Sequence, residues 1–156
     1  MLIYIRDLLS PEEYSRIREI CGTVIPCMNR DSSSEVVRYR YTFGANEYVS
    51  RVFSGLRGLP GSPTNSTPVE YRYYGVGGMM DWHRDTQLYD VPQYELVYTV
   101  DNTSDSETQW IDESSGELRS LRTEPNSLVI VRAGGVLHRV TPVGRGGRSI
   151  IKFVRI

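Results

Sequence analysis

The chain has 156 residues, which is enough for one domain with a single hydrophobic core and too few for two. Its hydrophobic fraction of 39% and charged fraction of 24% are ordinary for a globular protein and exclude a disordered or fibrous chain. The net charge of −1 offers no broad basic surface for nucleic acid or for an anionic membrane.

The cysteine content and the opening residues indicate a reducing compartment. Cys21 and Cys27 could pair, but two cysteines make no disulfide framework, and we interpret them as ordinary thiols. No secretory signal opens the chain, because Asp7 follows only six mostly apolar residues, and no segment is long enough to span a bilayer. We therefore expect a cytoplasmic protein with neither a membrane nor a nucleic-acid partner.

The first third of the sequence predicts two helices between short strands. Ser10 followed by Pro11 and Glu13 is typical of a helix start, and Gly22 is typical of a helix end. A second helix is indicated by apolar residues at positions 49, 52, 53 and 56. The expected elements are a strand at 1–5, a helix at 11–21, a polar loop at 32–35, a strand at 36–42 and a helix at 46–56.

From Pro68 onward the pattern changes to short strands separated by turns. We predict a mainly β fold with flanking helices, a double-stranded β-helix (jelly roll) core with the two N-terminal helices packed on one sheet. Residues 1–156 would form one domain, with helical support at 1–67 and the core at 68–156. The expected core strands are 69–74, 81–85, 94–100, 108–112, 117–121, 128–132, 136–141 and 149–156.

His83-Arg84-Asp85 carries the strongest chemical signal in the sequence. Two imidazoles and one carboxylate are the protein ligands that hold non-haem Fe(II) while leaving coordination positions open. In a strand, residues two apart share a face, so His83 and Asp85 would point the same way. His138 is the only other histidine, and Arg148 adds a planar cation suited to a carboxylate. The four residues together predict iron and a carboxylate-bearing co-substrate.

The sequence from Val69 to Ile156 resembles the Fe(II)/2-oxoglutarate-dependent dioxygenases, within the branch that contains the prolyl 4-hydroxylases. The similar motifs are spread evenly over this range. They are Tyr74-Gly75 with His83-Arg84-Asp85, Leu96-Val97-Tyr98 with Asn102, Ser127-Leu128-Val129-Ile130-Val131, and His138-Arg139-Val140-Thr141-Pro142-Val143 with Gly147-Arg148-Ser149.

The resemblance implies a catalytic role for these four residues. His83, Asp85 and His138 would bind Fe(II), and Arg148 would pair with the distal carboxylate of 2-oxoglutarate. O2 would be consumed and succinate and CO2 released, and ascorbate is a candidate reductant. The expected reaction is hydroxylation of a prolyl or other amino-acid residue in a peptide or protein, or of a free amino acid.

Three other functions stay open at this point. The fold could serve as a non-catalytic module that binds a metal and 2-oxoglutarate. A cupin-like protein could use the same ligands for manganese or zinc, because two histidines and an aspartate bind several metals. Oxidative demethylation of a nucleobase is disfavoured by the missing basic surface.

The sequence departs from the family at the co-substrate site. Many relatives place a tyrosine three residues before the first metal ligand, where this chain has Met80. Tyr74 or Tyr98 would then supply the hydroxyl that meets 2-oxoglutarate, unless both simply pack their rings. Ile150 offers no hydroxyl two residues after Arg148, where some branches have serine or threonine.

Substrate contacts are harder to assign. Arg38, Arg40 and Trp110 could line a substrate groove, although a solvated sheet face and a packed aromatic are the simpler interpretations. Trp82 is expected in the core, and Lys152 at the rim of the barrel on the same strand face as Arg148. The loops at 58–68 and 86–93 lie where a lid could close.

Overall fold

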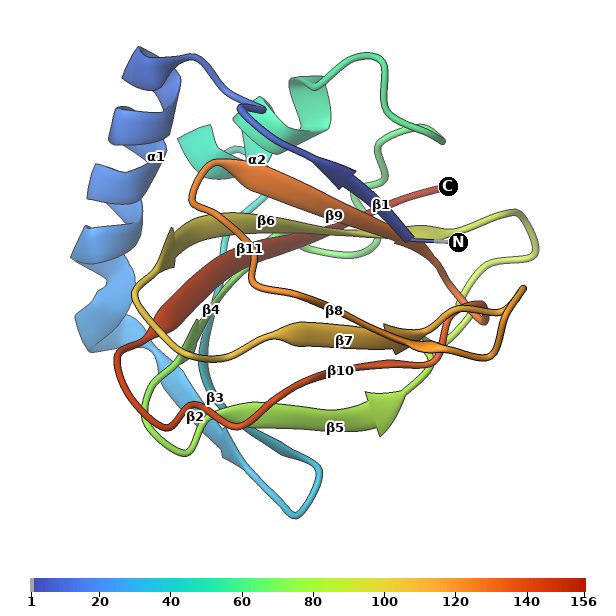
Figure 1. The fold of residues 1–156 in the computed structure, drawn as a ribbon. Helices are drawn as coiled ribbons and strands as arrows, with labels where there is room; N and C mark the ends of the chain where they lie inside the picture. Colours follow the sequence, from blue (N-terminus) through green and yellow to red (C-terminus); the bar gives the residue numbers. More distant parts are fainter. Residues whose placement is uncertain (1) are drawn as a thin grey trace.

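The computed structural model describes residues 2–156, which form one strongly curled antiparallel sheet accompanied by two α-helices (Figure 1). The order of strands across the sheet is β1-β9-β6-β11-β4-β3-β5-β10-β7-β8, and β2 pairs with β3 beside this path. The elements are β1 (Leu2–Ile5), α1 (Pro11–Val24), the 3-10 helix η1 (Ile25–Cys27), β2 (Asn29–Ser32), β3 (Val36–Thr42), α2 (Tyr48–Gly55), β4 (Glu70–Tyr74), β5 (Met79–His83), β6 (Tyr94–Asn102), β7 (Thr108–Ile111), β8 (Leu118–Leu121), β9 (Ser127–Arg132), β10 (His138–Val140) and β11 (Arg148–Arg155).

The sheet folds over on itself because β3, which also pairs with β2, divides its remaining pairing between β4 and β5. Its residues 39–42 pair with β4, while Val36 and Val37 pair with β5. The layer that contains β9, β6, β11 and β4 therefore faces a smaller layer of β5, β10, β7 and β8 (Figure 1). The mainly β, jelly-roll-like architecture expected from the sequence is confirmed at this level.

Alternation along the strands of the larger layer separates a helix-facing side from an inward side. On β11, Ile151 and Phe153 belong to the main hydrophobic cluster, together with Ile17 of α1 and Phe53 of α2. The intervening residues of β11 line a cavity inside the curled sheet instead. Because of this two-residue period, one face of the strand packs its apolar residues against the helices and the other face directs Ile150 and Lys152 into the cavity.

The helices begin as their sequences indicate, but α1 ends later than expected. The Ser10 hydroxyl accepts a hydrogen bond from the Glu13 amide, which is the cap that the sequence predicts. Gly22 does not end the helix, because the chain continues helically to Val24 and then into η1. No helix within residues 2–156 combines the length and apolar character needed to cross a membrane.

Three strands differ from the prediction. Strand β2 was not predicted and overlaps the expected 32–35 loop only at Ser32, and its polar sequence carries no apolar alternation because its residues are largely exposed. Strand β5 starts two residues earlier than expected and ends at His83, so Asp85 lies beyond it. Strand β10 is three residues long, half the predicted length.

The two cysteines are free thiols in different surroundings. Cys21 is buried in the main core, and this burial raises the pKa of its thiol to about 12, whereas Cys27 is exposed. Because the thiolate is the reactive form, we expect iodoacetamide to alkylate Cys27 and to spare Cys21 until the protein unfolds. Peptide mass spectrometry measures both sites, and equal labelling in the native protein would contradict the burial of Cys21.

Candidate functional site

The curl of the sheet brings the three expected metal ligands together. His83 ends β5 and His138 begins β10, and these two residues are direct partners in the antiparallel pair. Asp85 follows β5, where its carbonyl accepts a hydrogen bond of 2.8 Å from the Gly134 amide. Asp85 is therefore positioned by the loop before β10 and not by strand alternation with His83.

The three side chains converge on one point. The Nε2 atom of His83 lies 3.6 Å from Oδ1 of Asp85, and Nε2 of His138 lies 3.5 Å from Oδ2. One ligand atom from each residue lies within 4.8 Å of the others. This spacing suits three ligands on one face of a metal ion.

Both histidines are oriented by backbone carbonyls. Nδ1 of His83 lies 2.7 Å from the Asp81 carbonyl, and Nδ1 of His138 lies 2.9 Å from the Val136 carbonyl. Because a carbonyl only accepts hydrogen bonds, each Nδ1 carries the hydrogen, and each Nε2 presents a lone pair toward Asp85. A backbone partner that fixes the ring in this way is the usual support of a metal-binding histidine.

The electrostatics favour the metal-binding forms of His138 and Asp85, whereas His83 holds a proton more tightly than a free imidazole. Burial lowers the pKa of His138, and Asp85 only partly offsets this effect. Burial acts the same way on His83, but its contacts with Asp85 and the Asp81 carbonyl outweigh it and raise the pKa. Burial alone would raise the pKa of Asp85, but the two imidazoles lower it overall. The carboxylate is thus charged at neutral pH, as a metal ligand must be.

Arg148 is fully buried at the start of β11. Its Nη2 group donates a hydrogen bond of 2.7 Å to the Thr108 hydroxyl, while Nε and Nη1 have no hydrogen-bond partner among the described residues. Burial lowers the pKa of this guanidinium to about 10, so it remains charged at neutral pH. A buried cation with unused donors is costly unless an anion completes it.

The turn before Arg148 depends on Gly146, which has a φ of 70°. A Cβ atom at this position would collide with the carbonyl group of Thr103. A glycine therefore allows the tight entry into β11 that places Arg148 inside the sheet.

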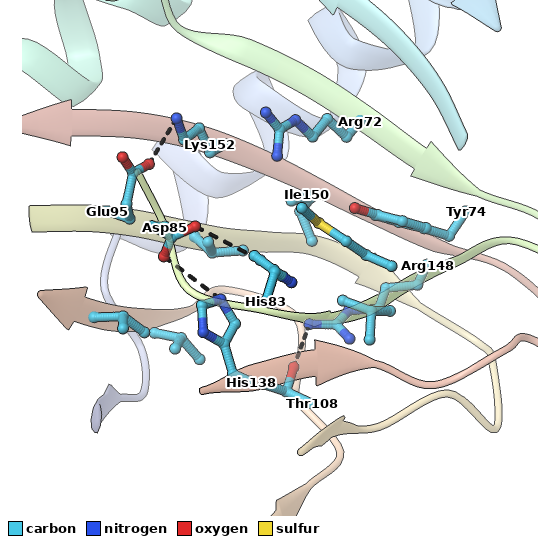
Figure 2. Close-up of a pocket in the computed structure, with 15 residues that line it drawn as sticks. Arg72, Tyr74, His83, Asp85, Glu95, Thr108, His138, Arg148, Ile150 and Lys152 are labelled. Carbon is cyan, nitrogen blue, oxygen red and sulfur yellow. Dashed lines mark hydrogen bonds and ion pairs between the residues drawn. The ribbon is translucent and has the colours of Figure 1, made fainter. Parts of the chain in front are cut away.

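One cavity contains the three ligands and Arg148 (Figure 2). Its remaining wall is a mixture of apolar and charged side chains from both layers of the sheet. The lining residues are Arg72, Tyr74, Met80, His83, Asp85, Glu95, Val97, Thr108, Val129, Val131, His138, Val140, Arg148, Ile150 and Lys152.

The structure brings Tyr74, but not Tyr98, to this cavity. Tyr74 is directly opposite Arg148 in the β11–β4 pair, and its hydroxyl accepts a long hydrogen bond of 3.4 Å from Arg38. Tyr98 lies on the helix-facing side of β6, where its hydroxyl donates to Asn126 at 2.8 Å. This placement does not support the expected contact of Tyr98 with 2-oxoglutarate, because alternation along β6 directs its side chain toward the helices and away from the cavity.

Two other expectations need correction. Lys152 does not sit at an exposed rim, since it lines the cavity with 16% of its side chain exposed and pairs with Glu95 at 2.6 Å. Trp82 is only partly buried, belongs to none of the buried clusters, and carries the Arg139 guanidinium 4.7 Å above its ring. A strand position predicts the face on which a residue lies, but not how far the opposite layer covers it.

The candidate substrate residues separate into different places. Arg38 contacts Asp31 and lies against Tyr74 and Met80, at the edge of the cavity. Arg40 pairs with Asp31 and Glu70 instead. Trp110 is opposite His138 in the β10–β7 pair and packs in a small apolar cluster. None of these three lines the cavity itself.

The two loops considered as a lid are connected to each other. The hydroxyls of Thr67 and Tyr89 lie 2.7 Å apart, which joins the 58–68 loop to the 86–93 loop. This contact gives the segment after Asp85 a fixed neighbour at the surface.

Sequence reasoning missed Thr108, Gln93 and Glu95. Glu95 accepts from the Gln93 side-chain amide at 2.6 Å, and Gln93 also bonds the Thr86 carbonyl and the Leu88 amide. Both side chains are buried. A glutamate inside the apolar run of β6 was the signal that could have revealed them, because buried charges are almost always paired.

We expect Gln93→Ala to lower the free energy of unfolding by about 2 kcal/mol, because the buried carboxylate of Glu95 and two part-buried backbone groups lose their partner. The amide of Leu88 should exchange hydrogen faster, since its acceptor is removed. Urea denaturation and hydrogen exchange measure both effects. Gln87→Ala is the matched control, because Gln87 is exposed and water can replace its contacts with the Tyr89 and Val91 carbonyls. Equal losses in the two variants would contradict a special role for Gln93.

Known proteins resemble the chain in structure only. No protein-family model and no curated protein sequence matches it. A prolyl-4-hydroxylase from Pseudomonas putida aligns over 99% of this chain and 91% of its own, with a TM-score of 0.79 and 15% identity. A Trichoplax adhaerens prolyl hydroxylase, solved with a hypoxia inducible factor peptide fragment, aligns over 99% and 83%, with a TM-score of 0.75 and 11% identity.

The fold is that of the 2-oxoglutarate–Fe(II) oxygenases. HygX from Streptomyces hygroscopicus, solved with nickel, 2-oxoglutarate and hygromycin B, has it as well, with a TM-score of 0.70 and 10% identity over 98% of this chain and 81% of its own. The match to this oxygenase fold extends beyond residues 69–156 to nearly the whole chain, including β1 and β3. At these identities the likeness concerns the fold, and the site residues rest on the geometry described above.

Proposed function

We propose that the protein is an Fe(II)- and 2-oxoglutarate-dependent dioxygenase that hydroxylates an aliphatic C–H group, with release of succinate and CO2. One observation carries this proposal: the His83–Asp85–His138 cluster and the incompletely bonded cation of Arg148 lie in the same cavity. A metal-binding module would need the three ligands but not the buried cation beside them.

The donor set fits Fe(II). Two Nε2 lone pairs and one carboxylate supply three ligand atoms, and the apolar side chains of Val97, Val129 and Val131 close part of the cavity wall. When bound with O2 and a 2-oxo acid, Fe(II) supplies oxidative decarboxylation coupled to C–H hydroxylation. The protein holds the three ligand atoms on one side of the metal position, and the apolar part of the cavity wall limits the access of bulk water.

Arg148 fits the distal carboxylate of 2-oxoglutarate. Thr108 accepts one hydrogen bond from Nη2, and Nε and Nη1 have no partner among the described residues, so the guanidinium can still bind an acceptor. Because Nη2 has a second N–H besides the one given to Thr108, it can form two parallel N–H···O bonds to one carboxylate together with Nε or with Nη1, which would fix the co-substrate and offset the cost of the buried charge. Tyr74 is placed to contribute its hydroxyl to the same end of the cavity.

The substrate we favour is a prolyl or other amino-acid residue in a peptide or protein, or a free amino acid. The prolyl hydroxylases among the similar structures support this class, and one of them holds a peptide fragment. Residues 1–156 would act as one catalytic unit, with 1–67 supporting the 68–156 core. A cytoplasmic location agrees with the two free thiols.

The test is succinate formation by anaerobically purified protein supplied with Fe(II), 2-oxoglutarate and O2. We expect slow turnover that His83→Ala and Arg148→Ala abolish, and stimulation by proline-containing peptides or amino acids that serve as substrates. Absence of turnover, together with no change in iron absorbance on anaerobic addition of 2-oxoglutarate, would refute the oxygenase. Binding of 2-oxoglutarate with no turnover under any substrate would favour the non-catalytic module.

A further inference from the structure

The only lysine of the chain lies in the cavity. The sequence contains 18 lysine and arginine residues in total, and Lys152 is the single lysine among them. It shares the inward face of β11 with Arg148 and Ile150, and all three line the cavity. Lys152 lies four positions after Arg148 along the strand, which corresponds to about 13 Å between their Cα atoms.

Arg72 accompanies Lys152 at this end of the cavity. It lies on β4 opposite Ile150, while Lys152 is opposite Glu70. Figure 2 shows Arg72, Lys152 and Glu95 on one side of the metal ligands and Arg148 with Thr108 on the other. The cavity thus has basic side chains on two sides of the metal ligands: Arg148 without a counterion on one side, and Lys152 and Arg72, each paired with a glutamate, on the other.

The two cations have unused donors. Lys152 contacts Glu95 at 2.6 Å, and Arg72 donates from Nε and Nη2 to the same oxygen of Glu70, at 2.9 and 2.5 Å. An ammonium group has three N–H donors and a guanidinium has five. Two ammonium hydrogens and the Nη1 group of Arg72 therefore have no acceptor among residues 2–156.

The neighbouring carboxylates, in contrast, have several partners. Glu95 accepts from Gln93 at 2.6 Å in addition to its contact with Lys152. Glu70 accepts from Arg40 at 3.3 Å in addition to Arg72. The two cations and two carboxylates balance in charge, and Glu95 Oε2 forms no hydrogen bond, but Lys152 and Arg72 still have N–H donors that a ligand with acceptors can use. A carboxylate provides such acceptors and forms charge-assisted hydrogen bonds with an ammonium and a guanidinium.

We propose that Lys152 and Arg72 bind a carboxylate of the primary substrate. This inference rests on the proposed function, because it takes Arg148 as the partner of 2-oxoglutarate. The substrate would then be a free amino acid or a peptide whose acidic side chain enters the cavity. A prolyl side chain inside a neutral peptide has no acceptor for these donors.

The unique lysine allows a direct test of occupancy. Protein loaded with Fe(II) and saturated with 2-oxoglutarate under anaerobic conditions is treated with an acetylating N-hydroxysuccinimide ester, and acetylation of Lys152 is followed by peptide mass spectrometry. Acetate, L-proline, L-aspartate, the blocked peptide Ac-Ala-Asp-Ala-NH2 and the neutral N-acetylprolinamide are the probes. We expect at least one carboxylate probe to slow acetylation about tenfold at saturation, and the neutral probe to have no effect.

The probes also separate the two sources of the carboxylate. Protection by L-proline or L-aspartate alone indicates a free amino acid, and protection by the blocked aspartyl peptide indicates an acidic residue. Equal acetylation with every carboxylate probe and with the neutral amide would overturn the proposal. Protection by 2-oxoglutarate alone that persists in Arg148→Met would also overturn it, since the co-substrate would then occupy Lys152.

Variants complete the test. Lys152→Met should weaken binding of the protecting probe at least about tenfold, because a charge-assisted hydrogen bond is lost, and Lys152→Arg should restore part of it. Affinity for 2-oxoglutarate should stay within about twofold in both, because Arg148 is untouched. The double variant Lys152→Met, Glu95→Gln removes both charges and serves if the single variant fails to fold. Unchanged probe affinity in these variants would overturn the proposal.

Failure of the proposed function has a different signature. If 2-oxoglutarate does not bind wild-type protein, the oxygenase assignment fails whatever the acetylation shows. Protection of Lys152 by acetate would then still reveal a carboxylate site.

Discussion

Arg148→Met is expected to abolish tight binding of 2-oxoglutarate while making the ligand-free protein more stable. The affinity should fall about 100-fold or more, because two charge-assisted hydrogen bonds to one carboxylate are lost. Stability should rise by about 1 kcal/mol or more, because methionine removes a buried cation that has no counterion. These opposite effects come from the same pair of unpartnered nitrogens.

The sign of the stability change follows from the pKa. Burial lowers the pKa of Arg148 to about 10, so the charged form is less favourable in the folded chain than in the unfolded one. This cost is fully present below pH 10 and decreases as the pH rises toward the ordinary pKa of 12.5. At neutral pH, Arg148→Met therefore avoids the full free-energy cost of burying the guanidinium charge.

Calorimetry with 2-oxoglutarate and urea denaturation without it measure the two effects. Arg145→Met is the matched control, because Arg145 lies in the same turn and its side chain is exposed. We expect it to change neither quantity. A wild-type affinity in Arg148→Met, or an equal loss in both variants, would show that Arg148 does not hold the co-substrate.

His138→Ala should reduce the affinity for Fe(II) or Mn(II) by at least about 100-fold, because one of three protein ligands is lost. Asp85→Asn should do the same, since the amide keeps the shape of the carboxylate but not its charge. Competition with a chelating dye measures the affinity. Asp90→Asn, an exposed aspartate in the following loop, should have no effect.

The histidine content makes this test specific. The chain has two histidines, so every imidazole signal in a magnetic resonance spectrum belongs to the site. Both should shift when Zn(II) is added, in proportion to its occupancy. Metal binding that leaves the imidazole signals unchanged would place the ion elsewhere and contradict the triad.

The fold could be predicted from the sequence where alternation and turns are regular. The strand expected at 94–100 is present as β6, and its alternate residues Leu96 and Tyr98 both belong to the main hydrophobic cluster. Strand β2 could not be predicted, because its residues are mostly exposed and no apolar period is needed there. Asp85 was expected beside His83 through strand alternation, but it lies beyond β5 and the loop before β10 positions it.

The residue types of the candidate site could be predicted from the sequence, but the shape of the cavity and the residues that line it could not. His83, His138 and Arg148 meet because the sheet curls, and the curl depends on the divided pairing of β3. No local pattern in the sequence reports such a division. For the same reason Lys152 was expected at the rim, and Glu95 was not expected at the site at all.

The placement of Arg148 and Lys152 on one strand has a consequence for selectivity. Strand β11 is hydrogen-bonded on both sides, to β4 and to β6, so it cannot stretch or bend without breaking the middle of the sheet. The backbone positions of Arg148 and Lys152 are therefore held at a constant separation. Loop closure can change access to the cavity but not this separation, and molecules that are too short or too long to fit between bound 2-oxoglutarate and Lys152 would be rejected by length alone.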